Sequence, residues 1–337
     1  MKLSIITINY NDATGLKKTL ESVAAQTYPN IQHVIVDGNS SDASKDIIID
    51  YAENTKNPNP EILWVSEKDK GIYNAMNKGI EIALGKRVVN DDHTSSPFAS
   101  RLSPLASDYI QILNSGDTLA APDVTERMMA ALAAQCAEIK GNEEVKGYRL
   151  EVKGNENGEA DTLASRLSPL ASRLENCPAI LYGNMIKVNA AGQVVGKSGY
   201  TEYSLRQFYQ STLNHDCAYI RKDLFEEYGL YDEQLKIVSD WKWYLQAIGL
   251  GRVKPVYVDI DVTIFDDGGI SETQLDRRAA ERRQVLEELL PPAVLWDYDT
   301  HAFEMEQMKR LRRWKMYGLV YFVERVLFKL EKWGVLR

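Results

Sequence analysis

Strand-like and helix-like segments alternate over the first part of the chain, and this alternation constrains the fold more than any other feature. The strand-like segments are LSIITIN (3–9), IQHVIVD (31–37) and EILWVSE (61–67). The helix-like segments that follow them, by the spacing of their apolar residues, are 16–26, 42–51 and 71–84. Strands separated by helices of this length form a parallel sheet with right-handed crossovers. We therefore predict an α/β fold, Rossmann-like, with a mostly parallel sheet and flanking helices.

A fourth apolar run, YIQILN (109–114), stops at a small polar turn with one carboxylate, Asp117. This aspartate lies just past the carboxyl end of the predicted strand, where ligands bind in open α/β sheets. A lone aspartate in a turn most often serves only the turn. A functional role for Asp117 therefore needs support from other parts of the chain.

Two stretches interrupt the alternation of strands and helices. The nonapeptide ASRLSPLAS occurs at 99–107 and again at 164–172. The two copies share an origin, but their surroundings do not repeat, so they do not mark a repeat fold. We interpret the regions 86–108 and 140–176 as inserted surface loops. Without the first, the helix ending at Gly85 would lead directly into the fourth strand.

The second half of the chain has its own pattern of elements. We expect a β-hairpin over 179–195, a helix over 239–249 and a strand over 252–266. A last helical element is expected from about 301 to 333. These elements predict one domain over 1–275 and a helical region over 276–337.

Charge is unevenly spread along the chain. The net charge is −8, but Lys309–Arg337 holds nine basic and two acidic residues, which leaves about −15 for the rest. Such a body is not expected to bind nucleic acid. The three cysteines show no metal spacing, and their odd number suits a reducing compartment. With no signal-peptide pattern at the N-terminus, we expect a cytoplasmic protein.

Polar residues also follow the first three predicted strands. Asp12 is expected to cap the helix after the first strand. Asp37 ends the second strand, where it can accept a hydrogen bond from a base or a ribose hydroxyl. After the third strand, Asn74, Asn77 and Lys78 share one helix face, which suits either a phosphate or sugar, or only solvent.

Several nucleotide-binding classes are excluded by missing motifs. No G-x-G-x-x-G follows the first strand, which argues against a Rossmann dehydrogenase. No G-x-x-x-x-G-K-[ST] is present, which excludes a P-loop enzyme. A sugar-phosphate nucleotidyltransferase would have a Gly-rich, Arg-containing loop after the first strand, and NYNDATG is not such a loop.

Five motifs, taken together and in order, resemble those of the family 2 glycosyltransferases with the GT-A fold. They are IITINYND (5–12), VIVDGNSSD (34–42), EKDKGIYNAMNKGI (67–80), ILNSGD (112–117) and YDEQLKIVSDWKWYL (231–245). The resemblance covers roughly residues 1–275 apart from the two insertions. An ordered set of five motifs is much more specific than any one of them.

The resemblance implies roles for individual residues. Asp240 would be the catalytic base, with His215 and Trp241 on the acceptor side. Asp117 would hold Mg²⁺ or Mn²⁺ against the donor diphosphate. The residues that would bind the nucleotide-diphospho-sugar donor are Thr7, Asn9, Asp37, Asp69, Lys70 and Ser115. The family often has carboxylates at the first and third positions of the metal motif, whereas this chain has Ser115 and Asp117, which predicts weaker metal binding.

The function that the resemblance implies is inverting, metal-dependent transfer of a sugar to a glycan or lipid-linked acceptor, in surface polysaccharide biosynthesis. The alternative is a catalytically impaired nucleotide-sugar-binding protein or a membrane-attached scaffold. A nucleotidyltransferase ranks third. Apolar residues between Leu319 and Leu330 recur at helical spacing beside Arg and Lys. This basic amphipathic helix suits an anionic membrane surface, and packing on the domain or on a second copy is the alternative.

Overall fold

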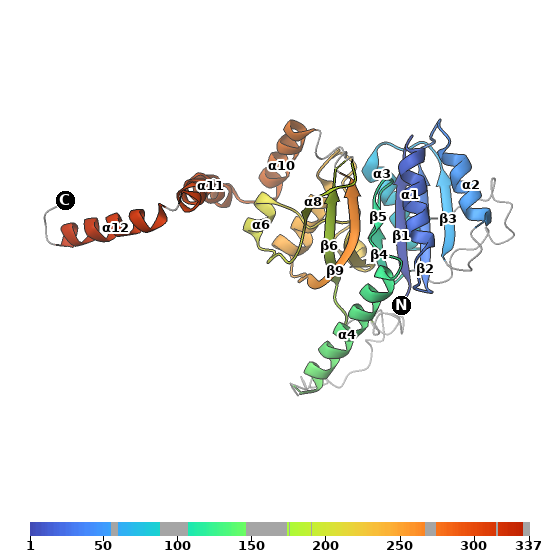
Figure 1. Cartoon of the computed structure of the whole chain (residues 1–337), viewed down its shortest axis with the longest axis horizontal. Coiled ribbons are helices and arrows are strands. Elements are labelled where there is room, and N and C mark those ends of the chain that lie inside the picture. Colours follow the sequence, from blue (N-terminus) through green and yellow to red (C-terminus); the bar gives the residue numbers. More distant parts are fainter. Residues whose placement is uncertain are drawn as a thin grey trace, which may run out of the picture. The chain divides into compact units, whose positions relative to one another are not determined.

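The computed structural model describes residues 1–54, 60–87, 107–145, 174, 176–189, 191–266, 274–314 and 316–332. The chain forms two compact units, Met1–Arg278 and Ala279–Arg337. The first unit contains a nine-stranded sheet with helices packed against it, and the second unit is helical (Figure 1).

The predicted parallel strands form one half of the sheet. They are β1 (Leu3–Asn9), β2 (Ile31–Asp37), β3 (Glu61–Ser66) and β4 (Tyr109–Ile112). Their spatial order is β3-β2-β1-β4, and every neighbouring pair in this set is parallel (Figure 1). All residues of β1, β2 and β4 are buried, as expected for parallel strands covered on both faces. The expected α/β architecture is confirmed here.

Helices cover both faces of these strands, because alternate residues of a strand point to opposite faces. The first three helices are α1 (Ala13–Ala24), α2 (Ser44–Asn54) and α3 (Ile72–Ala83). Ile35 of β2 packs in a cluster with residues of α1 and α2. Gly79 of α3 lies against the opposite face, where a Cβ atom on it would be 2.4 Å from Cγ2 of Ile6. The helices thus fix the strands from two sides.

The second half of the sheet is mixed rather than parallel. Its strands are β5 (Thr118–Leu119), β6 (Ile180–Val188), β7 (Val194–Lys197), β8 (Ala218–Arg221) and β9 (Val256–Asp266). Strand β8 runs antiparallel to β4 and to β6, whereas β9 runs parallel to β6. The expected hairpin is the pair β6 and β7, with Gly192 at a φ of 73° in the turn. The helices of this half are α4 (Val124–Val145), α6 (Leu205–Gln210), α7 (Leu224–Glu227) and α8 (Ser239–Tyr244).

The two expected insertions fall largely outside the described residues, which lack 88–106 and 146–173. The ends of the first insertion are close together. The Ser107 backbone N–H donates to the carbonyl of Ala83 at the end of α3, at 3.2 Å. Helix α3 therefore ends beside the start of β4, as expected for a direct connection between the two.

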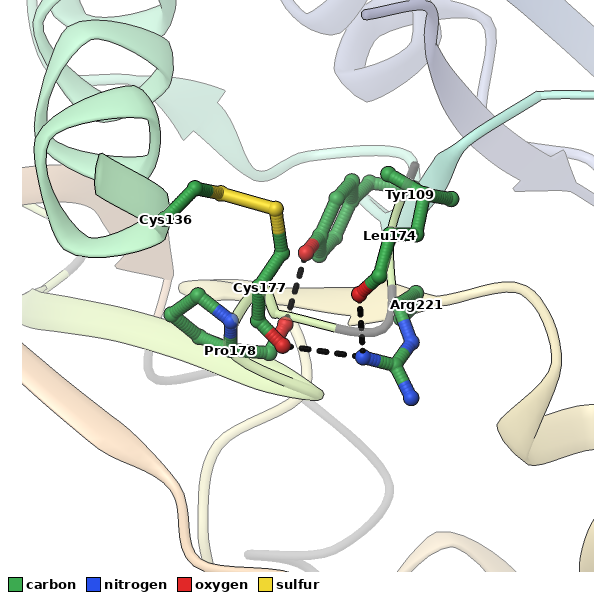
Figure 2. Close-up of a disulfide and its surroundings, with 6 residues drawn as sticks. All are labelled: Tyr109, Cys136, Leu174, Cys177, Pro178 and Arg221. Atoms are coloured by element: carbon green, nitrogen blue, oxygen red, sulfur yellow. Dashed lines mark hydrogen bonds between the residues drawn. A yellow bond between two sulfur atoms is a disulfide. The ribbon is translucent and has the colours of Figure 1, made fainter. Parts of the chain in front are cut away.

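The cysteines differ from the expectation of reduced thiols. Cys136 of α4 and Cys177 before β6 form a disulfide, with Cα atoms 4.3 Å apart, and Cys217 is free and buried (Figure 2). Arg221 donates to the carbonyl of Cys177 at 2.8 Å beside this bond. Disulfides are rare in reducing compartments, so the cysteines no longer support a reducing environment. Sequence spacing missed the pair because the two residues meet only in the folded chain.

The second unit contains two long helices after α10 (Leu275–Leu289), rather than one last element from about 301 to 333. They are α11 (Pro292–Arg313) and α12 (Tyr317–Lys332). Arg283 of α10 binds Glu287 at 2.6 Å and Asp299 of α11 at 2.7 Å. Among the described helices, none combines the length and the apolar character that crossing a bilayer requires.

Candidate active site

The carboxyl end of β1 is the point where the strand order of the parallel sheet reverses. Strand β2 lies on one side of β1 and β4 on the other. Asn9 ends β1 beside Asp37 of β2, and Asp37 lies beside Ser66 of β3. Ligands of open α/β sheets bind at this kind of switch point. The predicted donor residues Asn9 and Asp37 are therefore at the expected edge.

Asp37 organises the turn after β2. Its side chain is fully buried, and Oδ1 accepts hydrogen bonds from Asn9 Nδ2 at 3.0 Å and Ser40 Oγ at 2.5 Å. Oδ2 accepts from the Ser40 backbone N–H at 3.0 Å and from Ser66 Oγ at 2.7 Å. A carboxylate with four donors fixes the surrounding turn. Direct contact of Asp37 with a base stays a prediction.

Asn9 joins the turn after β2 to the turn after β4. Besides its bond to Asp37, its Oδ1 accepts from Ser115 Oγ at 2.9 Å. Ser115, which stands at the first position of the expected metal motif, is thus held by β1. Thr7 lies further inside the strand, fully buried, with its hydroxyl 3.0 Å from His33 Nε2. The structure therefore places Thr7 in the core rather than at the strand end.

Asp69 and Lys70 lie in the turn that begins α3. Asp69 Oδ1 accepts from the Gly71 N–H at 2.9 Å, and Gly71 has a φ of 128° that favours glycine. A Cβ atom on Gly38 would lie 2.5 Å from Asp69 Oδ2. The turns after β2 and β3 thus pack closely, and glycine makes this approach possible. Lys70 is exposed.

The turn from Asn114 to Asp117 is held by a residue that sequence reasoning missed. Thr19 of α1 is buried, and its hydroxyl donates to the Asp117 carbonyl at 2.7 Å. The same oxygen accepts from the Gly116 N–H at 3.1 Å. Gly116 has a φ of 98°, which a side chain would strain. The sequence did contain one indication of this role, because Thr19 is a polar residue on the face of the helix that is expected to be buried, and such a residue needs a hydrogen-bond partner inside the protein.

Asp117 is buried, with 5% of its surface exposed. In the part of the chain that the structure describes, no group of three His, Cys, Asp or Glu side chains is arranged to hold a metal ion. The described side chains therefore do not supply enough ligands to bind a metal ion without help from a bound substrate. They do fit Mg²⁺ or a similar hard cation, which takes one or two carboxylates and completes its shell with substrate phosphates and water. Asp117 would be the protein ligand of such an ion.

Asp240 belongs to a chain of hydrogen bonds that reaches the same turn. Tyr73 of α3 donates its hydroxyl to Asp240 Oδ1 at 2.8 Å. His215 Nδ1 lies 3.0 Å from Asp240 Oδ2, and its Nε2 lies 3.1 Å from Nδ2 of Asn114. His215 reaches Asn114 because β8 runs antiparallel to β4, so the residues before β8 lie beside the end of β4. The chain thus links α8 to the turn that carries Asp117.

The carboxylates around His215 hold it in its charged form. Burial alone would lower its pKa, but the hydrogen bond to Asp240 and the charges of Asp240, Asp216 and Asp117 outweigh burial and raise the pKa to about 9. Burial opposes the charge on Asp240, yet the bonds from His215 and Tyr73 lower the pKa of this carboxyl below its usual value. At neutral pH the pair is therefore an imidazolium beside a carboxylate. An imidazolium donates from Nε2 as well, so the Asn114 amide is hydrogen bonded to His215 with its oxygen, rather than its nitrogen, turned toward Nε2.

Several buried polar atoms near Asp240 have no hydrogen-bond partner among the described residues. They are the hydroxyls of Tyr231, Ser239 and Tyr244. A buried polar group without a partner costs about 1–3 kcal/mol. Ser44, Gln111, Thr125 and Tyr219, elsewhere in the described residues, also hold such atoms, so these hydroxyls add to the candidate site around Asp240 but do not define it.

The polar helix face of α3 has a structural use. Asn77 Nδ2 donates to the Tyr231 carbonyl at 2.8 Å, and Asn74 Nδ2 donates to Glu233 at 3.0 Å. Lys78 is nearly buried and pairs with Glu67 at 2.8 Å. This face therefore binds neighbouring protein segments and is not exposed only to solvent. Its contact with a phosphate or sugar stays a prediction.

Trp241, expected on the acceptor side, is 2% exposed, and its indole Nε1 donates to the Phe208 carbonyl at 2.8 Å. The tryptophan therefore fixes α6 against α8. A role in contact with an acceptor stays a prediction.

Comparison with known proteins identifies the family of the N-terminal part. The model of the family described as glycosyl transferase family 2 matches residues 4–139. An uncharacterized glycosyltransferase of Mycobacterium tuberculosis is 33% identical over 135 residues, which are 40% of this chain and 40% of that relative. A PGL/p-HBAD biosynthesis glycosyltransferase of Mycobacterium bovis is 22% identical over 280 residues, 83% of this chain and 82% of the relative.

Solved structures agree with the fold. Staphylococcus aureus TarS 1–349 in complex with UDP has a TM-score of 0.50 and 15% identity, over 79% of this chain and 60% of that chain. The complex of TarS 1–349 with UDP-GlcNAc also has a TM-score of 0.50, with 16% identity, over 81% of this chain and 61% of that one. The GT-A-like architecture is therefore confirmed.

Proposed function

Residues 4–139 of this chain belong to glycosyl transferase family 2, and we propose on this basis that the protein transfers a sugar from a nucleotide-diphospho-sugar to a glycan or lipid-linked acceptor. The observation that carries the proposal lies beyond the matched residues. Asp240 comes from the second half of the chain, yet hydrogen bonds through His215 and Asn114 tie it to the turn of Asp117. A candidate base and a candidate metal ligand thus meet at one strand edge.

The donor end of the proposed site is the switch point of the sheet. Asn9, Asp37 and Ser115 form one hydrogen-bonded set at this edge, with Asp69 packed against the adjoining turn. The TarS structures of the same fold were solved with UDP and UDP-GlcNAc, which supports a nucleotide sugar as the donor.

In the proposed reaction, Asp240 accepts the proton of the acceptor hydroxyl while that oxygen attacks the anomeric carbon, which inverts its configuration. The lowered pKa keeps this carboxylate ionised at neutral pH. Tyr73 and His215 each bind one of its oxygens and so fix its orientation. An acceptor hydroxyl would displace or share one of these bonds.

Asp117 would hold Mg²⁺ or Mn²⁺ beside the donor diphosphate. When bound, such a cation neutralises the negative charge that grows on the departing nucleoside diphosphate. With Asp117 as the expected protein carboxylate, the ion would bind well only together with the diphosphate oxygens. We therefore expect weak metal binding without nucleotide.

The test is release of nucleoside diphosphate from UDP-glucose, UDP-GlcNAc and GDP-mannose by wild type and by D240N. We expect D240N to lower the rate by roughly 10²–10⁴-fold, the usual contribution of general base catalysis, while nucleotide affinity changes little. The matched control D46N changes an exposed aspartate of α2 and is expected to retain full activity. Equal rates for D240N and wild type would contradict the role of Asp240.

The alternative, a nucleotide-sugar-binding protein or membrane-attached scaffold without activity, also has an observation in its favour. Both oxygens of Asp240 are already hydrogen bonded, and Ser115 stands where the family often has a carboxylate. Tight nucleotide binding by the wild type, with no release from any donor in the presence of an acceptor-containing membrane extract, would favour this alternative.

We also propose that the second unit binds an anionic membrane surface, in surface polysaccharide biosynthesis at the inner face of the cell membrane. Leu319, Phe322 and Val323 of α12 are more than two-fifths exposed, and Arg325 and Lys329 lie on the same helix. An exposed apolar stripe beside cations suits the interface of an anionic bilayer.

Liposome flotation tests the membrane proposal. Wild type is expected to float with vesicles of phosphatidylglycerol and phosphatidylcholine, and much less with phosphatidylcholine alone. A truncation that removes Lys309–Arg337 should stay at the bottom of the gradient. Equal flotation of both proteins would contradict the proposal.

A further inference from the structure

A continuous row of aromatic rings connects the neighbourhood of Asp240 to the surface of the first unit. It starts where Trp241, the neighbour of Asp240, donates to the Phe208 carbonyl. From Phe208 the successive ring centroids lie 5.4, 5.6, 5.4 and 5.7 Å apart through Tyr203, Tyr182, Tyr257 and Tyr200. Aromatic pairs at such separations stabilise one another. The row is therefore a fixed part of the fold.

Its outer end presents an exposed ring. Tyr200 is 69% exposed, although the backbone of the next residue, Thr201, forms two hydrogen bonds with the hydroxyl of Tyr182. Tyr182 donates its hydroxyl to the Thr201 carbonyl at 3.1 Å, and the Thr201 N–H lies 3.3 Å from the same hydroxyl. Val194 and Val195 of β7 are also more than half exposed. The protein thus holds a large aromatic ring in water at a defined place. A single exposed ring is common on protein surfaces, so its meaning depends on the groups beside it.

Hydrogen-bonding groups lie directly beside this ring. Asn184 is 1% exposed, and its Nδ2 donates to Oδ1 of Asp259 at 2.9 Å and to Oδ1 of Asp261 at 3.0 Å. The Tyr257 hydroxyl donates to Asn184 Oδ1 at 2.8 Å. Asp261 Oδ1 also forms an ion pair with Lys197 Nζ at 2.6 Å. These contacts, among the described residues, all use Oδ1 of the two carboxylates. Oδ2 of Asp259, on an exposed residue, can therefore accept a hydrogen bond from a ligand.

We infer that Tyr200, Tyr257, Asp259 and Asp261 form a binding surface for an oligosaccharide, the part of the acceptor glycan remote from its reacting end. This inference rests on the proposed function. A sugar ring has an apolar C–H face that packs on an aromatic ring, and hydroxyl groups that donate to carboxylates. The surface offers both kinds of group side by side. Tyr182, whose ring packs on Tyr257, pairs with Ala218, three residues after His215. The surface therefore belongs to the part of the sheet that adjoins the His215–Asp240 pair.

The experiment probes wild type and variants with an array of bacterial surface oligosaccharides, followed by affinity measurement with the glycan that gives the strongest signal. Y200A removes the exposed ring and Y200F keeps the ring without its hydroxyl. D259A removes the exposed carboxylate. The matched control W296A removes a ring that is 68% exposed on α11 in the second unit. UDP and GDP binding are measured in parallel on every variant.

We expect Y200A and D259A each to weaken glycan binding about tenfold, the size of one aromatic or charged contact, whereas Y200F and W296A bind like wild type. Nucleotide binding should be unchanged in all variants. The inference is overturned if wild type binds no oligosaccharide on the array, or if Y200A and D259A bind as tightly as wild type. It is also overturned if Tyr200 variants lose binding to peptides or vesicles instead. If wild type binds neither UDP nor GDP, the proposed function is contradicted, whereas the glycan measurements still decide whether this surface binds an oligosaccharide.

Discussion

His215 and Asp240 stabilise each other's charged forms, and this pair controls the chemistry near the strand edge. The pKa of His215 is about 9, above its ordinary value of 6.5. The protonated imidazole keeps Asp240 ionised, and Tyr73 supplies a neutral second donor. A carboxylate fixed in this way needs little reorganisation when it receives a proton.

The pair predicts how stability depends on pH. Because the pKa of His215 is higher in the folded chain than in the unfolded one, its contribution is complete below pH 6.5 and is lost as pH rises through about 9. The loss amounts to roughly 3 kcal/mol in the free energy of unfolding. Urea unfolding of wild type and H215Q from pH 6 to 10 measures it. H215Q should lack this part of the slope, and parallel profiles for the two proteins would contradict the prediction.

Tyr73 predicts a second effect at the residue scale. Y73F removes the hydroxyl that donates to Asp240 at 2.8 Å and keeps the ring that packs on Tyr231. A hydrogen bond to a charged group contributes about 1.5–3 kcal/mol, so we expect at least a tenfold loss in kcat for donor turnover. The midpoint of thermal unfolding and the affinity for nucleotide serve as controls. An unchanged kcat would show that Tyr73 does not orient the base.

The carboxylates Asp37, Asp117 and Asp240 could be proposed from the sequence as candidate site residues, because each lies at the end of a recognisable strand or in the first turn of a helix. Thr19 and Asn114 were not proposed, because their roles come from hydrogen bonds across the fold, to the Asp117 carbonyl and to His215. Sequence spacing carries no information on such contacts. Thr7 was selected because it lies near the end of the first strand, but its side chain is fully buried. Its contact with the donor stays a prediction.

At the scale of elements, α3 is fixed to the sheet by a close approach at Gly79. A Cβ atom there would lie 2.4 Å from Cγ2 of Ile6 and 3.5 Å from Cγ2 of Val36. G79A should therefore lower the free energy of unfolding by about 1–3 kcal/mol, as overpacking does, despite the better helix propensity of alanine. The control G318A lies in α12, where no atom is within 4 Å of the added methyl. If G79A stabilises the protein as much as G318A does, α3 packs less closely than described.

The disulfide constrains the connection between α4 and β6. It closes a loop with a sequence separation of 41 residues, for which the chain-entropy model gives a stabilisation of about 4 kcal/mol. We expect the double variant C136S/C177S to lose much of this value in urea unfolding, with C217S as the single-thiol control. Mass analysis after alkylation of the unfolded but unreduced wild type should find one free cysteine, because Cys217 is buried in the native protein. Three alkylated cysteines in the unreduced protein would contradict the pairing.

The elements were predicted unevenly, for physical reasons. Strands β1, β2 and β4 are buried along their whole length, so their sequences are largely apolar and easy to recognise. The mixed half depends on pairings such as β5 with β9 and β4 with β8, and these contacts join residues far apart in sequence. The division of the last helical region into α11 and α12 was also missed, because Trp314 and Met316 continue the apolar and basic pattern through the break.

Considered as a whole molecule, the chain combines a region that matches the model of glycosyl transferase family 2 with elements that this match does not include. The match ends at residue 139, whereas Asp240, His215 and the tyrosine surface around Tyr200 all follow it. The fold brings Asp240 and Asp117 to one edge by pairing β8 with β4. Sugar transfer from a nucleotide sugar, which we propose to be assisted by a metal ion at Asp117, is the function that fits this arrangement.

The most direct measurement is calorimetric titration of the full chain with UDP, GDP and dTDP, each with and without Mn²⁺, beside D117A. We predict that one nucleotide binds at least tenfold more tightly with Mn²⁺ present and that D117A loses this enhancement, because Asp117 and the diphosphate hold the ion together. Binding of no nucleotide, or identical metal dependence in wild type and D117A, would contradict the account.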